Sequence, residues 1–121
     1  MSGIDIWEFR STSGHVSGTD LVGFHVEATD GRIGKIDTLS EESGSRYLVV
    51  DTGPWIFGRH VLLPAGTVVQ VDPDDRKVYV DRTKDEIRSS PEYDPEKHNA
   101  DGDVYQDAYT GYYGPYYGGA V

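Results

Sequence analysis

The sequence contains no cysteine, no long apolar run and few basic residues. Without cysteine, disulfides and thiolate metal sites are excluded, and a reducing, intracellular compartment fits this composition. No apolar run approaches the ~20 residues of a membrane-spanning helix, and the N-terminal stretch lacks the basic and apolar regions of a signal peptide. We therefore expect a cytoplasmic chain without membrane insertion.

Acidic residues outnumber basic ones by 21 to 11, which gives a net charge of −10 at pH 7. Much of the excess lies in residues 91–121, which contain six acidic residues and a single lysine. Nucleic-acid binding requires a surface rich in lysine and arginine that holds phosphates. The charge therefore argues against nucleic acid as the main partner.

Motifs of familiar catalytic chemistry are missing from the sequence. There is no phosphate loop, no dinucleotide fingerprint, no nucleophile elbow and no His-Glu-x-x-His pair. His25 and His60 both fall on expected strands and could be neighbours, but two imidazoles without further ligands do not make a zinc site. We expect no enzyme activity, no catalytic residue, no metal site and no cofactor.

Short apolar strands separated by turns occupy residues 21–82. The stretch Leu21–Asp37 predicts a strand, a two-residue turn at Asp30-Gly31 and a second strand with a bulge near Gly34. In the first strand apolar and more polar side chains alternate, which places one face against a core. This apolar face consists of Val22, Phe24, Val26 and Ala28.

Further strands are expected at residues 47–51, 59–63, 67–72 and 77–81. After them, Thr83-Lys-Asp-Glu86 forms a capping box, which predicts a short helix that ends before Pro91. About six strands with short connections predict an all-β fold. The expected architecture is a small antiparallel β-barrel with a short C-terminal helix and flexible tails.

The chain is expected to divide into an N-terminal arm at residues 1–20, a barrel domain at 21–93 and a Tyr/Gly-rich acidic tail at 94–121. The composition changes after residue 90, because residues 91–121 hold seven of the nine tyrosines. We expect a mobile tail, partly docked through tyrosine, in which a short helix can form. Because a small core buries little of its surface, self-association or docking of the tails would help it.

Two groups of large apolar residues are candidates for partner binding. The loop at residues 53–58 carries Trp55, Ile56 and Phe57 between glycines, either as a plug for one end of the barrel or as a self-association patch. In the arm, Trp7 either packs onto the domain or anchors a partner. We expect a protein partner and a homodimer that uses Trp55, Ile56 and Phe57, with Trp7 and the Tyr-rich tail as further contact candidates.

Seven short motifs follow one another in a fixed order across the barrel domain. They are Leu21-Val-Gly-Phe24, Asp30-Gly-Arg-Ile-Gly-Lys-Ile36, Tyr47-Leu-Val-Val-Asp-Thr-Gly53, Val61-Leu-Leu-Pro64, Val78-Tyr-Val80, Thr83-Lys-Asp-Glu-Ile87 and Ser90-Pro-Glu-Tyr93.

This ordered set resembles the PRC-barrel domain family over about residues 20–93. The resemblance implies a small, roughly six-stranded β-barrel that acts as a protein-binding or assembly module, with no catalytic residues carried over. The chain looks like the standalone, single-domain bacterial members. Two alternatives stay open. One is a ribosome-associated factor, since a related barrel occurs in ribosome-maturation factors, and the other is a barrel that binds a small molecule or a metal.

Overall fold

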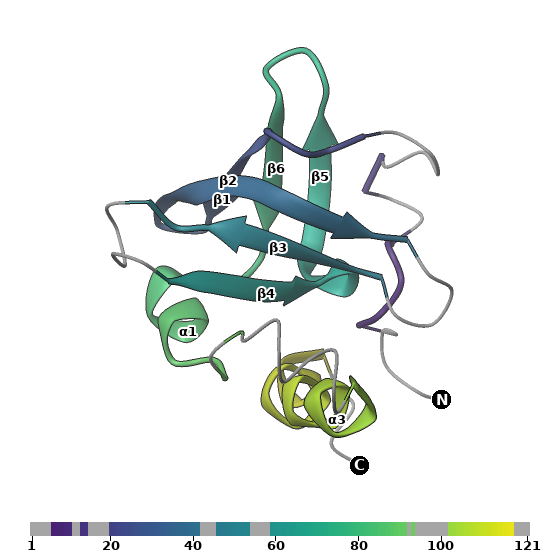
Figure 1. Cartoon of the computed structure of the whole chain (residues 1–121). Coiled ribbons are helices and arrows are strands. Elements are labelled where there is room, and N and C mark those ends of the chain that lie inside the picture. Colours follow the sequence, from purple (N-terminus) through teal and green to yellow (C-terminus); the bar gives the residue numbers. More distant parts are fainter. Residues whose placement is uncertain are drawn as a thin grey trace.

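Six strands form one curved mixed sheet, with two helices packed beneath it (Figure 1). This computed structural model describes residues 6–10, 13–14, 20–41, 46–53, 59–91, 93 and 102–117. The strands are β1 (His25–Ala28), β2 (Gly31–Ser40), β3 (Tyr47–Asp51), β4 (His60–Pro64), β5 (Val68–Asp72) and β6 (Lys77–Val80). The helical elements are η1 (Ala65–Thr67), α1 (Lys84–Arg88), α3 (Gly102–Tyr113) and η2 (Gly114–Tyr117).

The strand order in the sheet is β4-β3-β2-β1-β6-β5. Neighbouring strands run antiparallel except β1 and β6, which are parallel. The predicted number of strands is therefore confirmed, but the prediction of a purely antiparallel arrangement was wrong at this pair. The direction of β6 is set by its hairpin with β5, and this hairpin joins the sheet beside β1.

The sheet curves strongly but does not close into the expected barrel. Its edge strands β4 and β5 are joined directly by the η1 corner and cross at a steep angle in Figure 1. Within the described residues no ladder links them, because strands that cross steeply cannot align their backbone groups. Hydrogen bonds of Thr67 help to fix the corner: Thr67 Oγ1 donates to the Pro64 carbonyl at 2.8 Å, and the Asp81 amide donates to the Thr67 carbonyl at 3.0 Å.

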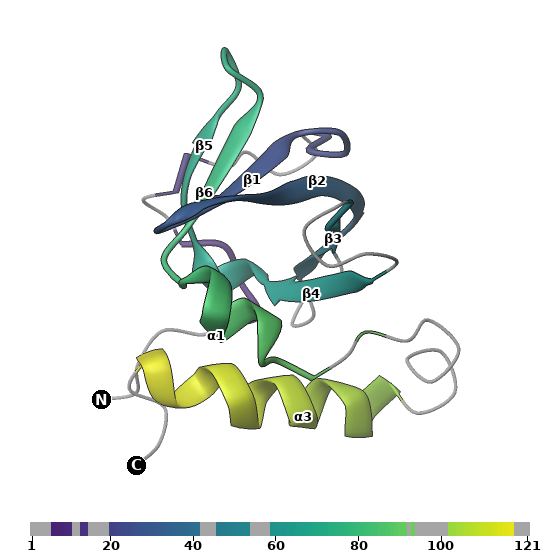
Figure 2. The same cartoon turned by 90° about the vertical axis from the view of Figure 1, so that its left-hand side faces the viewer.

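Strand β2 supplies much of the curvature because its register shifts twice. Ile33 is skipped in the ladder with β1, and Asp37 is skipped in the ladder with β3. Between the two shifts, Gly34 runs so close to β3 that an added Cβ would lie 2.0 Å from the carbonyl oxygen of Asp51. The predicted bulge near Gly34 is confirmed, and Figure 2 shows the resulting bend of β2.

The first hairpin turns one residue earlier than predicted. Ala28 pairs with Gly31, so Thr29 and Asp30 form the turn. Val22 lies ahead of β1 and is 44% exposed, which removes it from the apolar face on which alternation had placed it.

Helix α1 begins at the predicted capping box. The Glu86 amide donates to Thr83 Oγ1 at 3.1 Å, and the Thr83 amide donates to Glu86 Oε1 at 2.8 Å. The Asp30 carboxylate accepts the Lys84 amide at 2.8 Å, which ties the helix to the first hairpin. At the other end, the Arg59 guanidinium donates to two carbonyl oxygens at 3.0 and 2.9 Å, as basic groups do at helix C-termini.

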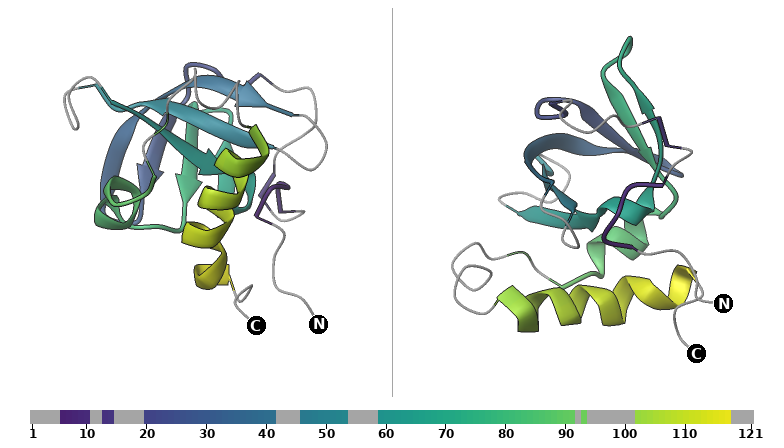
Figure 3. Two further views of the ribbon diagram at one scale, coloured as in Figure 1. Left: turned by 60° about the horizontal axis from the view of Figure 1, so that its bottom comes forward. Right: turned by 90° about the vertical axis from the view of Figure 1, so that its right-hand side faces the viewer.

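Strands β3 and β4 are buried on both faces. Residues 48–50 and 61–63 are all buried, although side chains alternate between the faces of a sheet. Val49 and Leu62 pair across the two strands and point away from the interior of the curved sheet. Helix α3 lies across this outer side of β4, as Figures 2 and 3 show.

Both terminal segments belong to the core. Ile6 and Trp7 are 5% and 7% exposed, and Tyr109 and Tyr113 are completely buried. The described residues of both tails are docked, which agrees with the expected packing of Trp7 and the expected docking through tyrosine, and the C-terminal tail forms the helix α3 where a short helix was expected. The reason is the one that the length suggested: a small β-domain has apolar surface left to cover.

Replacing Gly34 by alanine tests the bend. The new Cβ would meet the backbone of Asp51, which cannot move without disturbing β3. We expect Gly34→Ala to lower the free energy of unfolding in urea by about 3 kcal/mol or more. Gly111→Ala is the matched control, because its Cβ meets nothing within 4 Å and alanine favours the helix by up to ~1 kcal/mol. A Gly34→Ala protein as stable as wild type would contradict this account.

Candidate functional site: an apolar face closed by both terminal segments

The outer side of β3 and β4 carries apolar side chains that the β-sheet does not cover by itself. They are Tyr47, Val49, Leu62 and Pro64, which form two directly opposed pairs across the strands. We call these four residues the outer face. Left open to water, such a contiguous apolar patch on a small domain would mark an interaction surface.

Trp7 closes one part of the outer face. Its ring meets that of Tyr47 edge to face, with the centroids 6.3 Å apart and the planes at 88°. Its indole Nε1 donates to Thr110 Oγ1 at 2.8 Å, so it contacts both the sheet and α3. The Trp7 carbonyl also accepts the Arg46 amide at 3.0 Å, which fixes the backbone of the arm beside β3.

Helix α3 is held by its tyrosines. Tyr109 donates its hydroxyl to the Pro91 carbonyl at 2.8 Å, and Tyr112 donates to the carbonyl of Glu86 in α1. The rings of Tyr109 and Tyr113 stack with their centroids 6.5 Å apart. The helix contains four tyrosines, two glycines and one threonine, which are weak helix formers, and it is only 12 residues long. Its stability therefore comes from docking.

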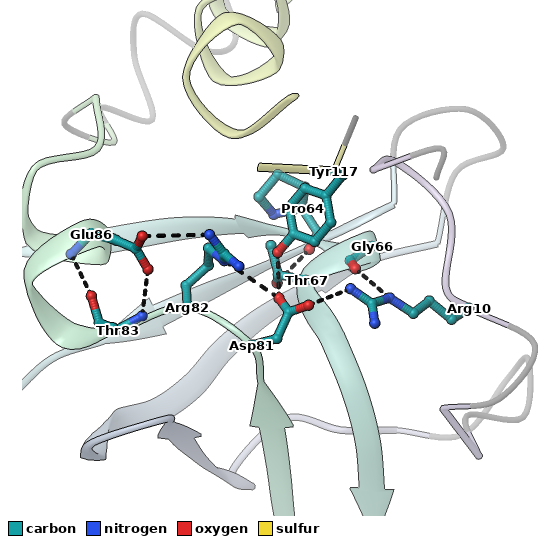
Figure 4. Close-up of polar contacts among 9 residues, drawn as sticks. All are labelled: Arg10, Pro64, Gly66, Thr67, Asp81, Arg82, Thr83, Glu86 and Tyr117. Atoms are coloured by element: carbon teal, nitrogen blue, oxygen red, sulfur yellow. Dashed lines mark hydrogen bonds and ion pairs between the residues drawn. The ribbon is translucent and has the colours of Figure 1, made fainter. Parts of the chain in front are cut away.

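The carboxylate of Asp81 joins both terminal segments to the end of β6 (Figure 4). From the N-terminal side, Arg10 Nη2 donates to Asp81 Oδ2 at 2.6 Å, and Arg10 Nε donates to the Gly66 carbonyl at 2.9 Å. From the C-terminal side, the Tyr117 hydroxyl donates to Asp81 Oδ1. We call these contacts the Asp81 node.

Guanidinium groups also pack against the aromatic rings of η2. The Arg82 Cζ lies 4.4 Å from the ring centroid of Tyr116 and 5.2 Å from that of Tyr117. Arg10 lies 5.5 Å from the Tyr117 centroid. Cations near an aromatic face are attracted by its negative quadrupole, so the two arginines hold the end of the C-terminal segment in place.

Burial raises the pKa of the Tyr113 hydroxyl above its ordinary value of 10.0. Burial also raises the pKa of Tyr117, and the hydrogen bond to Asp81 and the charge of that carboxylate raise it further. Both shifts favour the neutral phenol in the folded state. They mean that docking of the C-terminal segment is favoured while these hydroxyls keep their protons.

Of the residues that the sequence proposed for partner binding, the structure describes Trp7. Trp7 packs onto the domain, as one of the two interpretations expected, and its side chain is not open to a partner while α3 is docked. Trp55, Ile56 and Phe57 lie outside the described residues, so their role stays a prediction.

His25 and His60 are not neighbours. Cross-strand pairs connect His25 to Lys35, Lys35 to Asp51 and Asp51 to His60, which places the two histidines three strands apart, or about 14 Å. His60 Nε2 instead lies 3.9 Å from Asp37 Oδ2. Among the residues that the structure describes, no three His, Asp or Glu side chains gather in a way that could hold a metal ion.

Sequence reasoning missed the Asp81 node. Asp81 was assigned to the end of a strand, and neither Arg10 nor Tyr117 lies near it in the sequence. The available signal was indirect: three consecutive apolar residues in β3 and in β4 indicate burial on both faces, which requires a cover from elsewhere in the chain.

The fold defines a small β-rich domain. The PRC-barrel domain model matches residues 13–87, more than half of the sequence, and the chain belongs to this family. Comparison with curated protein sequences gave no match. In the part of the chain that the structure describes, no helix is both long and apolar enough to cross a membrane.

Alkaline pH tests the docking of the tyrosines. Because the folded-state pKa values of Tyr113 and Tyr117 lie above those of an unfolded chain, their contribution to stability is complete below about pH 10 and is lost as the pH rises further. We expect Trp7 to become exposed in this range as α3 leaves, detected by loss of its indole N–H signal in NMR.

Tyr117→Phe removes the hydroxyl that faces Asp81 and should reduce this alkaline loss, whereas Tyr79→Phe, on β6, serves as the control. If α3 stayed docked until the whole chain unfolded, and Tyr117→Phe left the transition unchanged, the Asp81 node would not be the point at which high pH acts.

Proposed function

We propose that this chain is a non-enzymatic, cytoplasmic interaction module that uses the outer face of β3 and β4 to bind an aromatic helix. The main support is the position of these residues relative to the family match. The outer face lies within the matched residues 13–87, whereas Trp7 and α3, which pack against it, lie outside them. The domain thus has an apolar face that accepts a helix, and in this chain the helix is its own.

The way in which α3 is held supports an exchangeable occupant. The helix buries tyrosine rings, whose large area dominates interface energies, while the hydroxyls of Tyr109 and Tyr112 reach the backbone carbonyls of Pro91 and Glu86. A second helix with aromatic residues in the same positions would meet the same groups. Exchange requires α3 to leave, and its weak intrinsic helicity lowers the cost of that step.

A peptide added in trans tests whether the face binds a helix. Tyr109→Ala combined with Tyr113→Ala should release α3 and shift the indole N–H signal of Trp7, with the sheet intact. We expect a synthetic peptide of residues 102–117 to restore that signal at a ratio of one to one. The control peptide carries serine in place of both tyrosines. Equal responses to the two peptides, or no response to either, would refute the proposal.

We further propose that the chain assembles as a homodimer through Trp55, Ile56 and Phe57. The support is compositional: three large apolar side chains lie in a row between glycines in a small domain. The family's association with assembly agrees with this role.

Light scattering on the full chain tests the dimer. We expect a dimer mass for wild type at tens of micromolar, and a monomer after Trp55→Ser combined with Phe57→Ser. Val22→Ser is the matched control, because Val22 is an exposed apolar residue elsewhere on the surface. A wild-type monomer whose mass the double substitution leaves unchanged would rule out this interface.

A further inference from the structure

A pocket of about 280 Å³ lies at the bend of β2, on the sheet face that is turned away from the core. Its walls come from β1, β2 and the end of β3. It is lined by His25, Arg32, Gly34, Lys35, Asp51, Thr52 and Gly53. The volume lies below that of most drug-sized sites, and therefore suits one small ligand or one group of a larger one.

The pocket is a product of the two register shifts in β2. The shift at Ile33 separates Arg32 from Gly34, and the shift at Asp37 follows Lys35 on the other side. Gly34 itself has a φ of +156° and has no room for a side chain. Bulges of this kind redirect side chains and are frequent beside functional sites.

Two cationic side chains in the pocket, Arg32 and Lys35, have hydrogen-bond donors that no described residue uses. Arg32 Nε donates to Glu27 Oε2 at 2.6 Å, but in the described part of the chain the two terminal nitrogens of Arg32 make no hydrogen bond. Lys35 likewise makes no ion pair with a described residue. Arg32 thus shares one ion pair with Glu27, as Arg10, Arg46, Arg82 and Arg88 do with carboxylates of their own, and it keeps its two terminal nitrogens for a ligand. The pocket thus places two cationic side chains, Arg32 and Lys35, beside the single lining carboxylate of Asp51.

The pKa of His25 reflects the charges around the pocket. Partial burial lowers its pKa, and Arg32, Lys35 and Lys77 lower it further against the opposing effect of Glu27. The ring is therefore neutral near pH 7 and can donate one hydrogen bond. Asp51 is the acidic lining residue, and its Oδ1 already accepts the Gly53 amide at 2.9 Å.

We propose that this pocket binds an oxyanion, a phosphoryl or carboxylate group, between the Arg32 guanidinium and the Lys35 ammonium, with the His25 ring at its side. Arginine and lysine both make strong, charge-assisted hydrogen bonds to such groups. The site is separate from the outer face of β3 and β4, so the chain can hold a small anion and a protein partner at the same time.

Binding and the protonation of His25 are linked. An anion beside the ring favours the imidazolium form, so bound anion raises the pKa of His25, and acid strengthens binding by the same factor. The charged neighbours that set the starting point are Glu27, Arg32, Lys35, Asp51 and Lys77.

NMR titration of the full chain with inorganic phosphate and, separately, with acetate tests the proposal, with sodium chloride at equal ionic strength as the reference. We expect saturable shifts of the Lys35 and His25 signals with a Kd of about 1 mM, as befits a single small group. Lys35→Gln and Arg32→Gln should each weaken binding about fivefold or more. Arg88→Gln, which removes one positive charge from α1, is the matched control.

Sulfate, whose charge is constant between about pH 5.5 and 7.5, tests the linkage. We expect binding about threefold tighter at the lower pH and a rise of the His25 pKa by about 0.5 at saturation, while His60, three strands away, does not respond.

Tighter binding of phosphate would identify a phosphoryl ligand, and equal or tighter binding of acetate would identify a carboxylate. Shifts that do not saturate, that chloride reproduces, that survive Lys35→Gln or that affect His60 equally would overturn the proposal.

Discussion

The central residues of the adjacent strands β3 and β4 are buried on both faces of the sheet, and the rest of the structure depends on this. Val49 and Leu62 point away from the interior of the sheet and yet are buried, so the chain has to supply a second layer on the outside of β3 and β4. Trp7, which packs against the Tyr47 ring, and α3, which lies on the outer side of β4, contribute to that layer. The family domain, the arm and the C-terminal helix therefore share one hydrophobic core.

Asp81 adds charged hydrogen bonds to the apolar contacts between the two terminal segments and the sheet. One carboxylate accepts hydrogen bonds from Arg10 and Tyr117, and the guanidinium groups of Arg10 and Arg82 flank the Tyr117 ring. The ion pair, the hydrogen bond and the ring contact involve the same three residues, Arg10, Asp81 and Tyr117. Loss of one of these side chains therefore weakens the remaining contacts of the other two. The N-terminal arm and the C-terminal segment are thus coupled although they lie at opposite ends of the sequence.

The elements that sequence predicted are those that local chemistry determines. The capping box at Thr83 and Glu86, the bulge at Gly34 and the number of strands follow from short-range patterns and were found where expected. The parallel pairing of β1 with β6 and the open edge at η1 depend on how the sheet curves, which no local pattern encodes. The sites were harder still: the Asp81 node unites residues from both ends of the chain, and the pocket at β2 arises from two register shifts.

The hydrogen bond from Trp7 to Thr110 joins residues 103 positions apart. During synthesis at roughly 5–20 residues per second, Trp7 is therefore made about 5–20 s before Thr110, and the outer face, which ends at Pro64, is complete about 2–9 s before it. Throughout that interval the nascent β-domain presents an apolar surface to chaperones, to the ribosome and to other nascent chains. A partner that competes with α3 for the outer face therefore has its best access before α3 has been synthesised.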